Sequence, residues 1–133
     1  YLKAADETEN RDLRDRFKQI AERRQSLADE LEGHISGHSQ VHPDEKNDLI
    51  GSLHPAWMGV KAALSSTGER GILEICRNLD QAALDAYDDA LQGDILYSDL
   101  KSLLVRQRTT ISEDFLEIDK MYFDYFPPAK NEL

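Results

Sequence analysis

The chain has 133 residues, of which 40% are hydrophobic and 32% charged, with a formal net charge of −10 at pH 7. These values describe a soluble globular domain long enough to bury a core, and no apolar run approaches the roughly 20 residues that a membrane-spanning helix needs. The acidic balance argues against nucleic acid and anionic membranes as partners, because both require clustered Lys and Arg.

The N-terminal part of the chain predicts a short helical segment and then a long amphipathic helix. Residues 1–7, YLKAADE, are typical of the last turns of a helix, most of which we expect to lie upstream of Tyr1. The long helix is predicted from about Asn10 to Ile35, with Asn10 as the N-cap that accepts an otherwise unpaired first-turn N–H. Its apolar residues recur at helical spacing and form one stripe. That stripe contains Leu13, Phe17, Ile20, Leu27, Leu31 and Ile35.

The connection that follows is long and carries the only tryptophan. Within it, SLHPAWMGVKAAL predicts a short helix over about 52–64, since Pro55 falls in the first turn, where a missing N–H costs little. His54 is expected at the start of this helix and Trp57 on its apolar face. We interpret the two residues as a crossover clamp that closes the bundle; the alternative is a Trp that binds a ligand.

Two further long helices complete the chain. The first is predicted over about 67–92, with a capping box formed by Ser66 and Glu69 and a stop at Gly93. Its apolar positions are Ile72, Leu73, Cys76, Ala83, Leu84, Tyr87 and Leu91. The second is predicted over about 98–123, ahead of Pro127 and Pro128. Its apolar positions are Leu100, Leu103, Leu104, Ile111, Ile118 and Met121.

The lengths of the connections predict the topology. The short loops on either side make antiparallel hairpins, and a crossover of some thirty residues joins them, which is the ferritin-like arrangement of four helices. We therefore predict an all-α, ferritin-like four-helix bundle whose long crossover carries a short extra helix and whose first helix is largely missing here. The domain is predicted to span 1–126, with a C-terminal tail over 127–133. A single cysteine, Cys76, is in keeping with a reducing cytoplasm.

Polar residues on the apolar stripes are the candidates for chemistry. We expect four of them to form a core polar cluster, in which an arginine pairs with carboxylates in the role that a metal would otherwise fill. This cluster contains Arg24, Asp80, Gln107 and Asp114. Two alternatives remain: Arg24 turns outward to solvent, or a metal is held by Glu22, Asp80 and Asp114. The Glu-x-x-His motif of di-iron bundles occurs nowhere in the chain.

Several segments in this order resemble an uncharacterised bacterial four-helix-bundle family of the ferritin-like superfamily, distantly related to rubrerythrins. They are YLKAA, AERRQSLADEL, GSLHPAWMGVKAAL, LDQAALDAYDDAL and the Arg106–Gln107 pair. The resemblance implies a ferritin-like bundle in which Arg24 and the core aromatic Tyr87 occupy family positions. Asp80 follows Leu79 where the family usually has Gly-Glu, and Asp114 stands where it often has His, so the resemblance implies no established activity.

These observations favour a non-enzymatic, cytoplasmic bundle protein with a structural or stress-related role and no cofactor, able to form a homodimer. The first alternative is a di-iron carboxylate protein of the rubrerythrin or ferritin type, using iron or manganese to handle iron or peroxide. The second is an interaction module that accepts a partner helix in an incomplete bundle groove.

Overall fold

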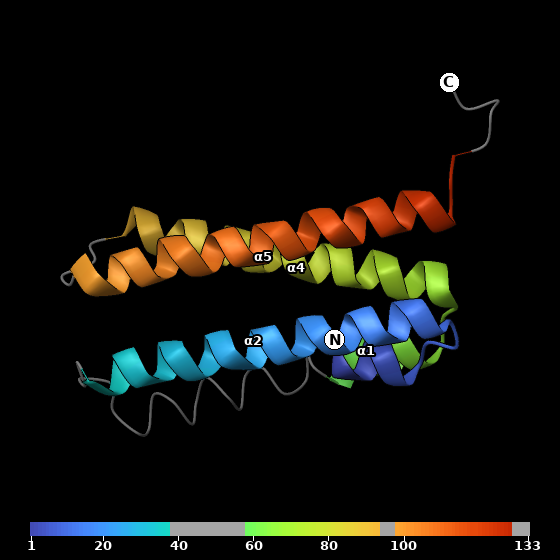
Figure 1. Ribbon diagram of the computed structural model, residues 1–133, viewed down its shortest axis with the longest axis horizontal. Helices are drawn as coiled ribbons and strands as arrows, with labels where there is room; N and C mark the ends of the chain where they lie inside the picture. The colour runs from blue at the N-terminus through green and yellow to red at the C-terminus, as the bar shows by residue number, and fades with distance from the viewer. Residues whose placement is uncertain (38–57, 94–97, 129–133) are drawn as a thin grey trace. The chain divides into compact units, whose positions relative to one another are not determined.

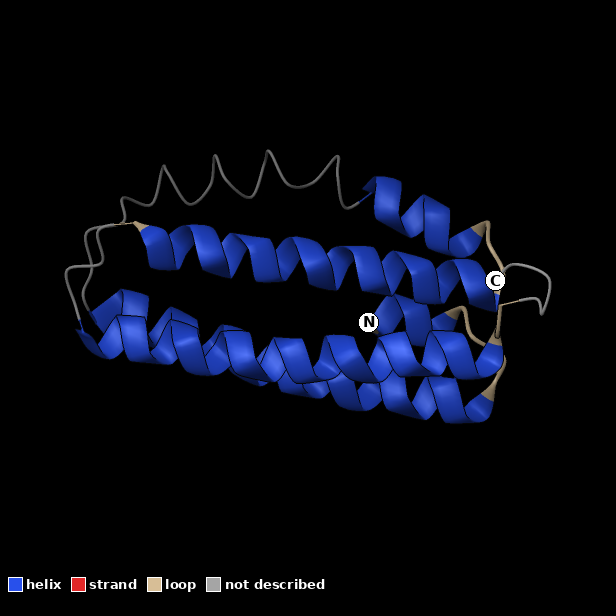
Figure 2. Cartoon of the chain, turned by 90° about the horizontal axis from the view of Figure 1, so that it is seen from above, coloured by secondary structure: helices blue, strands red, loops and turns tan. Residues whose placement is uncertain are grey.

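Figure 1 shows the computed structural model of the chain, which describes residues 1–37, 58–93 and 98–128. The elements in these ranges are α1 (Leu2–Asp6), α2 (Arg11–Gly37), α4 (Glu69–Gln92) and α5 (Ser98–Tyr125). Residues 58–65 are also helical, and the described ranges contain no strand (Figure 2). The all-α prediction is therefore confirmed. None of the described helices is both long and apolar enough to cross a membrane.

The chain divides into two compact units, Tyr1–Gly68 and Glu69–Leu133. In the first unit α1 packs against α2, and in the second α4 packs along α5 (Figure 1). Each pair is joined by a short connection, as the loop lengths predict. The prediction of one domain over 1–126 with a tail over 127–133 stays a prediction.

Local sequence explains where most helices begin and end. Asn10 is the N-cap of α2, because its Oδ1 atom accepts hydrogen bonds from the backbone N–H groups of Asp12 at 3.0 Å and Leu13 at 3.2 Å. α4 ends at Gln92, directly before the predicted stop at Gly93. α5 begins at Ser98, as predicted, and ends at Tyr125, two residues beyond the predicted end and shortly before the two prolines.

The predicted capping box of α4 is wrong. α4 begins at Glu69, and the Ser66 hydroxyl instead donates to the carbonyl oxygen of Ala63 at 3.2 Å. The Ser66 backbone N–H also points back, to Ala62 at 3.1 Å. Ser66 therefore terminates the helix over 58–65, and a hydroxyl committed to that end does not cap the next helix.

The apolar stripes form the cores of both units. Leu13, Phe17 and Ile20 are fully buried, whereas Leu27 and Leu31, further along α2, are half-buried. Leu64 of the helix over 58–65 is buried. In the second unit, the buried apolar residues are Ile72, Leu73, Cys76, Leu84, Leu103, Leu104, Ile111 and Ile118, with Tyr122 beside them. The side chain of Ile35 lies outside the described residues.

Candidate functional site

Side-chain contacts between α4 and α5 show how the two helices pair. Arg77 Nη2 lies 2.7 Å from Asp119 Oδ1, and the Tyr87 hydroxyl donates to Gln107 Oε1 at 2.6 Å. Arg77 precedes Tyr87 along α4, whereas their partners occur in the reverse order along α5, with Gln107 before Asp119. The two helices are therefore antiparallel, and these contacts fix which residues lie level with one another.

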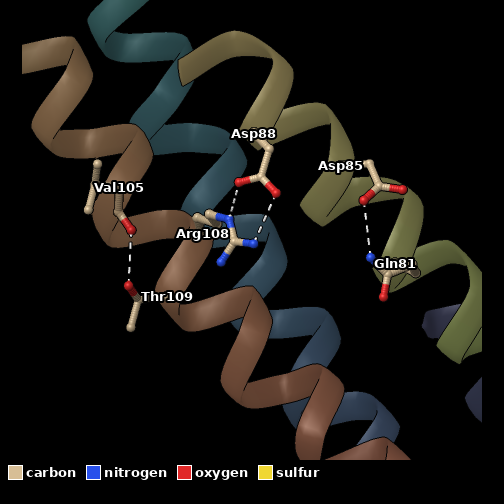
Figure 3. A network of polar contacts seen from close by, with 6 residues as sticks. All are labelled: Gln81, Asp85, Asp88, Val105, Arg108 and Thr109. Carbon is tan, nitrogen blue, oxygen red and sulfur yellow. Dashed lines mark hydrogen bonds and ion pairs between the residues drawn. The ribbon is translucent and has the colours of Figure 1, made fainter. Parts of the chain in front are cut away.

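Arg108 and Asp88 make the third contact, which is bidentate (Figure 3). Arg108 Nε donates to one carboxylate oxygen of Asp88, and Nη2 donates to the other at 3.0 Å. The hydrogen bond from Arg108 holds the pKa of Asp88 below its ordinary value of 3.8. The same bond raises the pKa of Arg108, so both groups are charged at neutral pH.

Asp80 and Asp114 lie close to the same level of this hairpin, between the two ion pairs, because the register that joins Arg77 to Asp119 brings Asp80 opposite the turn of α5 that holds Asp114. Both are buried, with 1% and 3% of their surface exposed, and Gln107, two turns from Asp114, is 0% exposed. Buried carboxylates are stable only where neighbouring groups satisfy them. All three residues do interact with other groups. They are the buried polar positions in an otherwise apolar stripe, with Asp80 and Asp114 at one level and Gln107 two turns away, and we call the three together the Asp80 layer (Asp80, Gln107 and Asp114).

Tyr87 closes one side of the Asp80 layer. Its side chain is half-buried, and its hydroxyl gives the buried Gln107 amide oxygen a hydrogen-bond donor. The predicted core aromatic is therefore an amphipathic bridge, with its ring against the hairpin and its hydroxyl at the layer.

A second cluster lies at the end of the hairpin opposite the α4–α5 loop. Tyr122 is 7% exposed, and its hydroxyl accepts from Arg70 Nε at 3.1 Å and donates to Glu74 Oε1 at 2.8 Å. The guanidinium carbon of Arg77 lies 4.5 Å from the centroid of the Tyr122 ring, a cation–π distance. We call these four residues the Tyr122 clamp. This clamp was not predicted from the sequence, although Tyr122 continues the spacing of Ile111 and Ile118 on α5.

Arg24 belongs to the first unit, whereas the other members of the predicted polar cluster belong to the second. Its guanidinium carbon lies 5.3 Å from the centroid of the Tyr1 ring. Arg24 and Tyr1 also line a groove of about 340 Å³ on α1 and α2, together with Leu2, Ala21 and Ala28. The meeting of Arg24 with the Asp80 layer stays a prediction.

The remaining predicted residues divide into exposed and undescribed ones. Glu22, proposed as a metal ligand with Asp80 and Asp114, is exposed on α2. Within the described ranges, no group of three or more His, Cys, Asp or Glu side chains is placed to hold a metal ion. His54 and Trp57, the crossover clamp, lie outside the described residues.

These features define an all-α protein made of antiparallel helical hairpins, one of them with a buried polar layer. Residues 1–93 match a family described as Domain of unknown function (DUF2383). Because the match covers more than half of the chain, the protein belongs to this family. The match includes Asp80 and Tyr87 but ends before α5, which carries Gln107 and Asp114. Neither curated proteins nor solved structures gave a match.

Proposed function

We propose that this chain is a non-enzymatic, cytoplasmic helical-bundle protein of ferritin-like topology with a structural or stress-related role, in which the Asp80 layer fixes how helices pair. The order of the elements supports the topology. A short connection joins α1 to α2 and another joins α4 to α5, while a long connection with a helix over 58–65 lies between the two pairs. That is the connectivity of a ferritin-like bundle.

The observation that carries the proposal is the hydrogen bond from Tyr87 to Gln107. A fully buried amide whose oxygen accepts from the neighbouring helix at 2.6 Å serves helix pairing. The two ion pairs that flank the layer serve the same end, since each joins α4 to α5. Buried polar groups of this kind penalise any slipped register, in which they would lose their partners.

The buried carboxylates of Asp80 and Asp114 raise the alternative that the protein binds iron or manganese. A di-iron centre of the ferritin-like type uses a Glu from each of two helices and a Glu-x-x-His from each of the other two. The described residues do not fit such a centre, because Asp80 and Asp114 supply two carboxylates and Glu22 is exposed. We therefore derive no metal-dependent step.

Metal analysis of the purified protein separates these two functions. The whole chain is dialysed against Fe²⁺ without oxygen, or against Mn²⁺, and bound metal is measured by elemental analysis. We expect no stoichiometric metal, and equal traces in Asp80→Asn/Asp114→Asn and in the control Asp85→Asn/Asp89→Asn, whose carboxylates are exposed on α4. Stoichiometric metal that only the first double variant loses would overturn the proposal in favour of a metal protein.

A helix-accepting role is the other alternative, and the groove beside Arg24 is the observation that favours it. Along the apolar stripe of α2, burial falls from Ile20 to Leu27 and Leu31. The occupant would be an amphipathic helix with a carboxylate facing the Arg24 guanidinium. A designed peptide of this kind should bind the chain, and the groove-filling variant Ala28→Trp should abolish binding. Equal binding to the variant would refute this role.

A further inference from the structure

α5 carries large apolar side chains on the face opposite its buried stripe. Val105 is 49% exposed, Leu116 is 62% exposed and Phe123 is 47% exposed. Val105 and Phe123 are about five full turns apart, at roughly 3.6 residues per turn, and Leu116 falls within about 20° of the line that joins them. We call these three residues the outer stripe. Isolated exposed hydrophobes are ordinary, and these three differ in lying in line, so they give one face of α5 an apolar line that a partner can cover.

The residues around the outer stripe are suited to a contact from which water is excluded. Phe123 is held in place, since its ring meets the Tyr122 ring edge-on at 5.3 Å and lies 5.4 Å from the Arg77 guanidinium carbon. Thr109 lies beside the stripe, and its hydroxyl donates to the Val105 carbonyl oxygen at 3.1 Å, within its own helix (Figure 3). That hydroxyl therefore loses little when water is removed.

Charge is distributed unevenly along α5. Arg108 and Asp119 are paired with α4 and Asp114 is buried, so these three residues do not contribute charge to the outer surface. Among the other charged residues, the first half of α5 contains Lys101 and Arg106 against Asp99, and the second half contains Lys120 against Glu113, Glu117 and Asp124. The surface of α5 is thus more basic at one end and more acidic at the other, so two antiparallel copies bring opposite charges together at their ends.

We propose that the outer stripe is a self-association surface, on which α5 of a second copy packs antiparallel across a two-fold axis near Ser112 and Leu116. In this arrangement Val105 of each copy meets Phe123 of the other. Arg106 and Asp124 are also about five turns apart, so they lie on the same side of the stripe, and the two-fold axis brings Arg106 of one copy to Asp124 of the other. Asp124 exchanges its exposed partner Lys120, at 3.6 Å, for this contact.

The size of the surface sets the strength of the contact. The outer stripe is about 27 Å long at roughly 1.5 Å per residue, and a helix is about 10 Å wide. This is less than the roughly 800 Å² that each partner buries in a standard interface. The dimer is therefore weak and forms only at high protein concentration, and the monomer folds without it.

Sedimentation equilibrium of the whole chain, from micromolar to millimolar concentration, tests the proposal. The wild-type protein should shift from monomer to dimer over this range, and Leu116→Glu should weaken the dimer at least tenfold. The matched control is Leu79→Glu on α4, which removes a leucine that is 45% exposed but lies off the stripe, and it should not change the dimer. Circular dichroism verifies that both variants keep their helices. A monomer at every concentration, or a dimer that the two variants weaken equally or not at all, would overturn the proposal.

A charge swap tests the antiparallel orientation independently. Arg106→Glu and Asp124→Arg should each weaken the dimer severalfold, because like charges then face each other, and the double variant should restore it. Restoration cannot come from a repaired fold within one copy, since the two positions are about five turns apart on the same helix. If the double variant is as weak as the sum of the single ones, the antiparallel pairing is wrong.

Discussion

Removing the Tyr122 ring should destabilise the α4–α5 hairpin far more than removing the Tyr122 hydroxyl. The hydroxyl bridges Arg70 and Glu74 of α4, while the residue as a whole is only 7% exposed, at the end of the hairpin opposite the α4–α5 loop. Tyr122→Phe deletes only the bridge. Tyr122→Ala also deletes the surface on which the Arg77 guanidinium lies, 4.5 Å from the ring centroid.

The magnitudes follow from what each variant leaves behind. In Tyr122→Phe, Arg70 and Glu74 keep their own ion pair at 3.6 Å, and their side chains are 65% and 49% exposed, so water replaces the lost bonds. We expect a loss of about 1 kcal/mol in the free energy of unfolding. Tyr122→Ala removes a buried aromatic ring and should cost about 3–5 kcal/mol. Its cation–π contact adds about 0.5–1 kcal/mol at a partly exposed site.

Urea unfolding monitored by circular dichroism at neutral pH measures both losses. The control is Tyr125→Ala, which removes a tyrosine of the same helix that is 40% exposed, and it should change the free energy of unfolding by less than about 0.5 kcal/mol. If Tyr122→Phe costs as much as Tyr122→Ala, the hydroxyl bridge dominates and the packing argument is refuted. If both resemble the control, Tyr122 does not clamp the helices.

Three further variants test single contacts. Asn10→Ala should cost about 1 kcal/mol of unfolding free energy, because two first-turn N–H groups lose their acceptor, while Asn10→Ser should retain most of it; equal losses would contradict the cap. Tyr87→Phe should cost about 1–3 kcal/mol by leaving the buried Gln107 oxygen without this donor, and a double-mutant cycle with Gln107→Leu should show coupling, whereas additive losses would exclude it. Because the pKa of Asp88 is lowered in the folded state, its ion pair with Arg108 stabilises the fold above pH 3.8, and this stabilisation is lost as the pH falls through the lower folded-state pKa. The free energy of unfolding should therefore fall less on acidification in Asp88→Asn than in the wild-type protein. The same fall in both proteins would contradict the lowered pKa of Asp88.

Apolar periodicity and caps were sufficient to predict the helices. The stripe from Leu13 to Ile20 is buried as expected, and the Asn10 cap forms with the expected geometry. The failure at Ser66 has a physical cause, because a Ser three residues before a Glu fits the capping box but fits the end of a preceding helix equally well. Whether Ser66 ends the helix over 58–65 or caps α4 depends on where the first of these helices stops, and the spacing of Ser66 and Glu69 does not determine that position.

The candidate site was only partly predictable for a related reason. Burial of Asp80, Gln107 and Asp114 follows from their spacing among apolar residues. The shared level of Asp80 and Asp114 does not follow from spacing, because it depends on the register between the two helices, which a single sequence does not contain. The Tyr122 clamp and the Arg108–Asp88 pair depend on the same register.

The two faces of α5 have separable roles, and this separation makes the proposals independent. The inner face pairs with α4 through Gln107 and the residues level with it, whereas the outer stripe shares no described hydrogen bond with that layer. Effects at positions without shared partners add. Gln107→Leu should therefore lower the stability of the monomer without changing the dimerisation constant per folded chain, and Leu116→Glu should do the reverse. Coupling between the two substitutions would mean that a second copy helps to fix the register of the hairpin itself, so that folding and self-association are one process in this protein.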